Sequence, residues 1–328
     1  MHGKSSDGKS SRVKQLDPDY EVIYLANATP DSLNGKSVYD SNTGKMIDIP
    51  PTWFQKLEKK CKEKPEKIHI LFFDEMTNAP LSIQNYAFNI VLDKEVNGIW
   101  KLPENVRIAA AGNEIEDSKS AEELTEPLFN RFAHAYIETT TENWLKWAMT
   151  DDSEYTSLDY KEDNLPMKIH PSICAYIAYK QHSGEGVLRT KYNGKTPNAD
   201  PRKWEMASKV LYTTKNPEMI RSLVGEDVTK DFVYFCRQSV LSVDDVVNDN
   251  FSDNDLVMSF GEKYFTAVGL SSCSDSELEK VRNFVSSYLG AEPKALFDSL
   301  WAHDDKKRLE RIMELDMSIN NGNGGIAK

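Results

Sequence analysis

The sequence predicts an α/β fold in which a parallel sheet carries helices on both faces and is followed by an all-helical region. Strand and helix signals alternate over residues 1–141, a pattern typical of parallel sheets joined by helical crossovers. From residue 142 onward the apolar residues recur at helical spacing. A glycine-rich segment at residues 3–10 and an apolar strand ending in two carboxylates indicate what kind of site the sheet carries.

The elements expected in residues 1–141 follow from apolar spacing and from residues that start or stop helices. Short apolar runs predict strands at 21–26, 67–73, 106–111 and 135–138. Helices are predicted at 9–16, 51–64 and 82–92. A hairpin is expected at 95–102, around Asn97-Gly98, and a short helical or irregular piece at 122–132. Residues 30–51, rich in Asp, Ser, Asn, Gly and Pro, are predicted to be an irregular insertion.

The remaining residues divide into two predicted helical parts, a lid at 142–240 and a C-terminal extension at 241–328. Helices of the lid are expected at 142–149, 171–180, 201–211 and 217–224. In the extension, an apolar stripe at 278–289 and a charged helix at 294–317 are predicted. The Asn- and Gly-rich residues 320–325 predict a flexible tail.

Composition excludes several classes of protein. The 328 residues contain no apolar run long enough for a membrane span and no leader-type apolar segment after Met1. The net charge of −12, without a groove that combines basic and aromatic residues, argues against nucleic acid as a partner. We therefore expect a cytoplasmic protein with reduced thiols at its four widely spaced cysteines, Cys61, Cys174, Cys236 and Cys273.

The segment from Gly3 to Ser10 fits G-x-x-x-x-G-K-[ST], the phosphate-binding loop of P-loop nucleoside triphosphatases. Gly3 and Gly8 permit the curvature that turns backbone N–H groups inward toward phosphate. Lys9 is expected to contact the β- and γ-phosphates and Ser10 to ligate Mg²⁺, with Ser11 also among the nucleotide-binding residues. The alternative is a flexible Gly/Ser/Lys tail, which the second motif makes less credible.

That second motif is the apolar strand that ends in Asp74 and Glu75. Ligands bind to α/β sheets at the carboxyl ends of the strands. Since adjacent strand residues face opposite sides, the two acids are expected to have different tasks. Asp74 is expected to hold Mg²⁺ through water, and Glu75 to orient and deprotonate an attacking water. A strand-end acidic turn is the alternative interpretation.

The order of these features resembles the AAA+ ATPases, and within them the MoxR-like branch, over most of residues 3–240. The run Val-Arg-Ile-Ala-Ala-Ala-Gly-Asn at 106–113 is similar to the family's sensor strand, so Asn113 matches its polar sensor. The segment 124–132 resembles the one that ends in the arginine finger, which implies that Arg131 reaches a neighbouring subunit's γ-phosphate. Asp-Pro-Arg-Lys-Trp-Glu at 200–205 resembles the lid segment in which Arg202 would be the second sensor.

The sequence departs from this family at its start. A strand of about five residues is expected before Gly3, at the centre of the sheet, and this first strand is missing from the chain. Two explanations stay open. Met1 is an internal methionine of a longer protein, or the chain is a degenerate or regulatory paralogue.

The resemblance implies Mg²⁺-dependent hydrolysis of ATP in a homo-oligomer, a hexameric ring, because an arginine finger acts across subunits. It further implies a chaperone-like role in remodelling or activating a partner protein, such as one with a von Willebrand factor A domain. A nucleotide-sensing scaffold with little turnover is the first alternative. A nucleic-acid motor is the second, which the charge disfavours.

Overall fold

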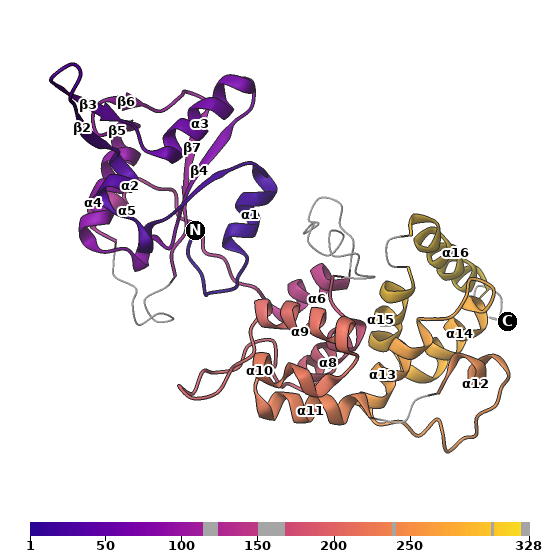
Figure 1. Cartoon of the computed structure of the whole chain (residues 1–328). Helices are drawn as coiled ribbons and strands as arrows, with labels where there is room; N and C mark the ends of the chain where they lie inside the picture. The colour runs from indigo at the N-terminus through magenta and orange to yellow at the C-terminus, as the bar shows by residue number, and fades with distance from the viewer. Residues whose placement is uncertain (114–123, 150–167, 238–240, 303–304, 323–328) are drawn as a thin grey trace. The chain divides into compact units, whose positions relative to one another are not determined.

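The computed structural model describes residues 1–113, 124–149, 168–237, 241–302 and 305–322 (Figure 1). The chain divides into two compact units, Met1–Thr139 and Thr140–Lys328. The predicted three-part division at 141/142 and 240/241 stays a prediction. Among the described residues, no helix combines the length and the apolar character that crossing a membrane requires.

The first unit contains a parallel sheet of three strands in the order β1-β4-β7. These strands are β1 (Glu21–Tyr24), β4 (His69–Asp74) and β7 (Val106–Ala110), which the apolar runs predicted. Both partners of the central strand β4 run parallel to it, so the carboxyl ends of all three strands lie at the same edge of the sheet. The α/β fold predicted from the alternation of elements is confirmed.

Helices cover both faces of this sheet because alternate residues of β4 point to opposite sides. Ile70 and Phe72 pack with Val13 of α1 (Lys9–Leu16) on one face. Leu71 and Phe73 pack on the other face with α3 (Thr52–Glu63) and α4 (Leu81–Asp93). Each phenylalanine is fully buried, which contributes about 1.5–3 kcal/mol relative to an exposed side chain.

Beyond β7 the sheet continues through single bridges rather than full strands. His2 forms parallel bridges with Gly112 on one side and with Tyr136 on the other. The amide of His2 donates to Ala135 O over 2.8 Å, and the amide of Ile137 donates to His2 O over 2.8 Å. His2 therefore lies between the end of β7 and the chain around Tyr136, where the predicted fold has its central strand.

One prediction changes here. The strand expected at 135–138 forms only this one bridge, because the neighbouring segment offers one paired residue before the chain turns at Gly3. As expected, the described residues contain no full strand before Gly3. His2 forms only bridges there, and the carbonyl of Met1 accepts from the Gly112 amide over 3.1 Å.

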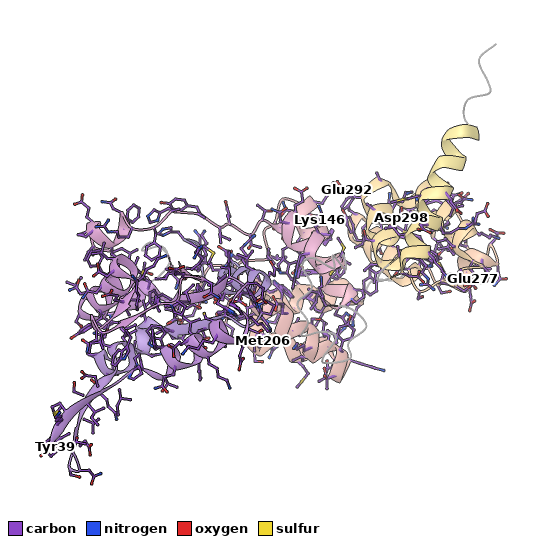
Figure 2. All side chains as sticks on the ribbon, turned by 90° about the horizontal axis from the view of Figure 1, so that it is seen from above. Tyr39, Lys146, Met206, Glu277, Glu292 and Asp298 are labelled. Atoms are coloured by element: carbon purple, nitrogen blue, oxygen red, sulfur yellow. The ribbon has the colours of Figure 1, made fainter. Side chains whose placement is uncertain are left out.

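The prediction of an irregular insertion at 30–51 is wrong. The segment forms α2 (Pro30–Asn34) and an antiparallel hairpin of β2 (Lys36–Asp40) and β3 (Lys45–Ile49). A capping box between Thr29 and Ser32 starts the helix, and the two strands pair in antiparallel register from Lys36 with Ile49 to Asp40 with Lys45. The hairpin, with Tyr39 near its end, projects from the rest of the unit (Figure 2).

The other elements of the first unit are short. The hairpin predicted at 95–102 is confirmed. Of the piece predicted at 122–132, residues 122 and 123 lie outside the described part of the chain, and residues 124–132 contain one short helix. These elements are η1 (Leu25–Asn27), η2 (Met76–Asn78), β5 (Glu95–Val96), β6 (Trp100–Lys101) and α5 (Glu126–Phe129).

The second unit is helical in all its described elements, as predicted. One core surrounds Tyr176, Trp204 and Phe232, and another surrounds Val281 and Phe297. The elements are α6 (Thr141–Met149), α8 (Pro171–His182), α9 (Pro201–Thr214), η4 (Pro217–Ile220), α10 (Arg221–Val224), α11 (Glu226–Cys236), α12 (Val243–Val247), α13 (Phe260–Leu270), α14 (Leu278–Phe284), η5 (Val285–Leu289), α15 (Ala291–Trp301) and α16 (Lys306–Gly322).

The helical stretch predicted at 294–317 is divided between two helices, α15 and α16. The carboxylate of Asp305 accepts from the amides of Lys307 and Arg308, at 2.8 and 3.2 Å, and so caps a new helix start. Helix α16 runs to Gly322, so the flexible tail predicted at 320–325 is helical at 320–322. Its remaining residues, 323–325, lie outside the described part of the chain.

Candidate functional site

The glycine-rich segment at 3–10 forms a tight loop that leads directly into α1. Gly8 precedes the helix with φ +74°, a left-handed conformation that glycine adopts without strain, and Ser6 shares that region with φ +69°. The N-cap residue of α1 is Gly8, which has no side chain to accept from the first helical N–H groups. The first helical N–H groups and the positive end of the helix dipole therefore face the loop, an arrangement suited to phosphate.

Gly3 lies so close to the backbone of Ile137 that no other residue fits at this position. A Cβ atom at this position would lie 2.3 Å from Ile137 O, a contact that only glycine avoids. The loop is also closed from within by Asp7, a residue that the motif did not single out. Asp7 is 3% exposed, and its carboxylate accepts from the Lys4 amide over 2.8 Å. The sequence does not single out Asp7, because acidic residues before a glycine are common in turns. Its role in the loop is evident only from its burial and its contact with Lys4.

The ammonium group of Lys9 occupies the concave side of the loop. Its Nζ donates to Gly3 O over 2.7 Å, to Lys4 O over 2.8 Å and to Asn113 Oδ1 over 3.0 Å. Lys9 is 8% exposed, and a buried cation requires such acceptors. An anion bound in the loop would meet this cation directly.

The next residue, Ser10, connects the loop to the central strand. Its hydroxyl donates to Asp74 Oδ2 over 2.8 Å, and Asp74 Oδ1 accepts from the Glu75 amide over 2.9 Å. Hydroxyl and carboxylate oxygens fit Mg²⁺, which takes one or two protein ligands and completes its shell with water and phosphate. No group of three or more acidic, His or Cys side chains in the described ranges could hold a metal. Ser10 and Asp74 thus fit a cation that shares its shell with a bound phosphate.

Strand alternation predicted that Glu75 faces the opposite side of the strand from Asp74. This prediction is wrong, because Glu75 lies beyond the end of the strand. β4 ends at Asp74, and Glu75 is exposed with φ +56°. A non-glycine residue held in the left-handed region costs of the order of 1 kcal/mol, and such strain clusters at functional sites. The turn directs the chain into η2 and leaves the Glu75 carboxylate at the carboxyl edge of the sheet.

Asn113 comes to the same place from β7. The Thr77 hydroxyl donates to Asn113 O over 3.1 Å, while Asn113 Oδ1 accepts from Lys9. Gly112 permits this approach, because a Cβ atom there would lie 2.6 Å from Thr77 Cγ2. Lys9, Ser10, Asp74 and Asn113 are therefore brought together from three separate parts of the sequence.

Two other predicted site residues of the first unit, Ser11 and Arg131, make no side-chain hydrogen bond or ion pair with this cluster in the described part of the chain. Ser11 is exposed on α1, and Arg131 is exposed just after α5, where its amide donates to Leu128 O over 3.2 Å. Arg202 belongs to the second unit. It is exposed at the start of α9, beside the helix cap that Asp200 makes with the Lys203 amide over 3.0 Å.

Comparisons with known proteins give no family for this chain: no protein-family model and no curated protein matches it. Solved structures of NtrX from Brucella abortus are similar. One has 14% identity over 96% of this chain and 63% of its own, with a TM-score of 0.36. The complex of NtrX with ATP has 15% identity over 91% of this chain and 62% of its own, with a TM-score of 0.37. The complex with ADP has 14% identity over 91% of this chain and 63% of its own, also with a TM-score of 0.37. The chain thus spans less than two thirds of these NtrX chains, and the likeness at this level identifies neither family nor activity.

Proposed function

We propose that this chain binds ATP and hydrolyses it with Mg²⁺, as a member of the MoxR-like branch of the AAA+ ATPases. The observation that carries the proposal is the cluster at the carboxyl end of β4. There, buried Lys9 lies inside the loop and Ser10 donates to Asp74. A cation, a hydroxyl and a carboxylate in front of a helix N-terminus are the groups that a magnesium-bound triphosphate requires.

Each residue of the cluster has its own task in the proposed reaction. The loop amides and the N-terminus of α1 bind phosphate oxygens, for which Gly3 and Gly8 shape the backbone. Lys9 exchanges its carbonyl acceptors for the β- and γ-phosphates. Ser10 and Asp74 hold Mg²⁺, Asp74 through water. When bound, the cation neutralises charge that develops on the transferred phosphoryl group.

Two further side chains act on the attacking water. Glu75, exposed at the sheet edge, orients the water and accepts its proton. Asn113 helps to place the same water, and its 3.0 Å hydrogen bond to Lys9 keeps it next to the phosphate end of the nucleotide. The task of Glu75 needs an accessible carboxylate, which its position after β4 supplies.

The proposed assembly is a homo-oligomeric ring, of six subunits, in the cytoplasm. Arg131 is exposed and would complete the site of the next subunit, where it stabilises charge in the transition state. Arg202 would contact nucleotide from the helical unit. The work of the ring is to remodel or activate a client protein, such as one with a von Willebrand factor A domain. Neither a membrane nor nucleic acid has a part in the proposed function.

The proposal is tested by the ATP hydrolysis rate per subunit, measured against protein concentration. A specific rate that rises with concentration, and collapses in both Lys9→Ala and Arg131→Ala, would support a ring with shared sites. Lys14→Ala is the matched control, because Lys14 is an exposed lysine of the same helix as Lys9. Absence of turnover at every concentration, with a folded chain, would contradict the proposed hydrolysis.

A nucleotide-sensing scaffold is the second candidate. It is favoured by the chain before the loop, where His2 forms only single bridges in place of a full strand, so that the loop has little support for productive geometry. Glu75→Gln separates the two functions. In an ATPase this change abolishes turnover and leaves nucleotide affinity in place, whereas in a scaffold there is no turnover to lose.

A further inference from the structure

Two histidines connect the start of the phosphate loop with the segment that carries Arg131. His2, directly before Gly3, has its Nε2 atom 2.7 Å from His134 Nδ1. The other ring nitrogen of His134, Nε2, lies 2.8 Å from Phe129 O. Phe129 ends α5, two positions before Arg131. A continuous path of side-chain hydrogen bonds therefore runs from His2 to the last residue of that helix.

The chemistry of the partners fixes the direction of these bonds. A carbonyl oxygen only accepts, so His134 Nε2 carries a hydrogen and donates to Phe129 O. In neutral His134 the Nδ1 atom then accepts, and His2 Nε2 donates to it. Burial lowers the pKa of His2, and the positive charges of the N-terminal ammonium group and Lys9 lower it further, which favours the neutral ring that this arrangement uses. The path needs both nitrogens of His134 and one nitrogen of His2.

Ring stacking supports the same geometry. The rings of Phe129 and His134 stack at 3.7 Å and 17°, and the rings of His2 and Tyr136 stack at 5.0 Å and 24°. Both histidines also border a small cavity, whose lining includes Met76 and Phe132. The stacked rings and the hydrogen bonds together determine how the two imidazoles are oriented.

The path continues into the nucleotide site through the backbone. Hydrogen bonds to Ala135 and Ile137 hold the backbone of His2 on both sides. The carbonyl of the next residue, Gly3, accepts from Lys9 Nζ over 2.7 Å. The residue that would bind phosphate and the helix that precedes Arg131 are thus joined by direct contacts within one subunit.

We propose that His2 and His134 are positioning residues, which hold the Arg131 segment in the orientation needed by the neighbouring subunit. The inference rests on the proposed function, because it assigns a task to Arg131 in a shared site. Neither histidine touches the nucleotide or the attacking water. Their effect is exerted through Phe129 and the chain that follows it.

The test uses mixed rings, in which one subunit supplies only the arginine and the other only the nucleotide site. Lys9→Ala subunits lack their own turnover but keep Arg131, and Arg131→Ala subunits keep their own site. Mixing them restores hydrolysis if the site is shared. The two histidines are then altered only in the Lys9→Ala subunit, so that every nucleotide site that turns over is unchanged.

Three alterations of the Lys9→Ala subunit separate positioning from folding. His134→Phe keeps the stack on Phe129 but removes both hydrogen bonds. His2→Gln keeps an N–H donor at the position of Nε2, and His2→Ala removes it. Tyr136→Phe is the matched control, because it keeps the ring that stacks on His2 and removes none of the hydrogen bonds of the path. Ring size and thermal melting are measured for every variant.

We expect His134→Phe and His2→Ala to reduce the restored rate about 10- to 100-fold, since small misplacements of a catalytic group cost this much. His2→Gln and Tyr136→Phe are expected to preserve the rate. Equal restoration by all four variants would overturn the positioning role while leaving the shared site intact. A mixture of the two parent variants that stays inactive would overturn the shared site itself, and the positioning role with it.

Discussion

The Ser10 hydroxyl donates a 2.8 Å hydrogen bond to Asp74 Oδ2 across 64 residues of sequence. The bond joins the first turn of α1 to the last residue of β4. The loop at residues 3–10 and the central strand therefore meet through the hydroxyl oxygen of Ser10 and a carboxylate oxygen of Asp74. A hydroxyl that donates to a carboxylate occupies that carboxylate oxygen. In the proposed reaction a bound cation takes the place of this hydrogen bond, with the Ser10 oxygen as a direct ligand and Asp74 holding the cation through water.

The first prediction concerns Asp74. Asp74→Asn keeps an oxygen that can accept from Ser10 but removes the charge that holds Mg²⁺. We expect turnover to fall about 10²- to 10³-fold, the cost of losing one transition-state charge contact. The rate is measured against MgCl₂ concentration, with Asp93→Asn, an exposed carboxylate at the end of α4, as control. An unchanged magnesium dependence in Asp74→Asn would contradict the metal role.

A second prediction concerns the contact between Gly112 and Thr77. Gly112→Ala places a Cβ atom 2.6 Å from Thr77 Cγ2 and 2.9 Å from its hydroxyl, so the chain next to Asn113 must shift. We expect a loss of stability of about 1–3 kcal/mol, typical of overpacking. Thr77→Ala in the same chain removes the clash, so the two changes should be strongly non-additive. The free energy of unfolding is measured in urea for both single variants and the double variant, and simple additivity would refute the clash.

The sequence predicted most of what positions this cluster. The run Ile-Leu-Phe-Phe before Asp74 predicted a buried strand because a central parallel strand is apolar on both faces, and β4 is buried over His69–Phe73. The spacing of Gly3, Gly8 and Lys9 predicted a loop in front of a helix for a local reason. Backbone curvature and helix start both depend on neighbouring residues.

Contacts between distant residues could not be predicted in the same way. The hairpin at β2 and β3 has few residues that face a core, so composition suggested an irregular loop although its pairing is regular. Nothing near His134 in the sequence points to its partner. That partner, His2, is 132 residues away and meets His134 because His2 pairs with Tyr136, two positions further along the chain.

A third prediction concerns Asp17, which connects the end of α1 to the start of β4. Its buried carboxylate accepts from the Ile70 amide over 2.9 Å and from Lys67 Nζ over 2.7 Å. Burial raises the pKa of Asp17, but the hydrogen bonds from Lys67, Ile70 and Asp19 together lower it by more than burial raises it. The pKa of Asp17 is therefore below its ordinary value.

The folded pKa of Asp17 therefore lies below the unfolded value of 3.8, so its contribution to stability is present above pH 3.8 and lost as pH falls through the folded pKa. Asp17→Asn removes this acid-dependent loss, and it weakens the contact with Lys67 by about 1–3 kcal/mol at pH 7. Urea unfolding between pH 2 and pH 7 measures both effects. An equally steep loss of stability in acid for the variant would show that other carboxylates cause it.

The last prediction concerns His170, the residue that caps α8 in the helical unit. Its Nδ1 atom accepts from the Ser172 amide over 3.3 Å, which requires that nitrogen to carry no hydrogen. Burial lowers the pKa of His170 below the ordinary value of 6.5. The unfolded chain then binds the proton more readily, so the contribution of His170 to stability is fully present above pH 6.5 and is lost as pH falls through the folded pKa.

His170→Asn offers an amide oxygen as helix cap and does not titrate. We therefore expect the melting temperature of this variant to match the parent's at pH 8 and to fall less than the parent's between pH 7 and pH 5. Thermal melting across this range measures the difference, and parallel curves for the two chains would exclude His170 as the titrating group.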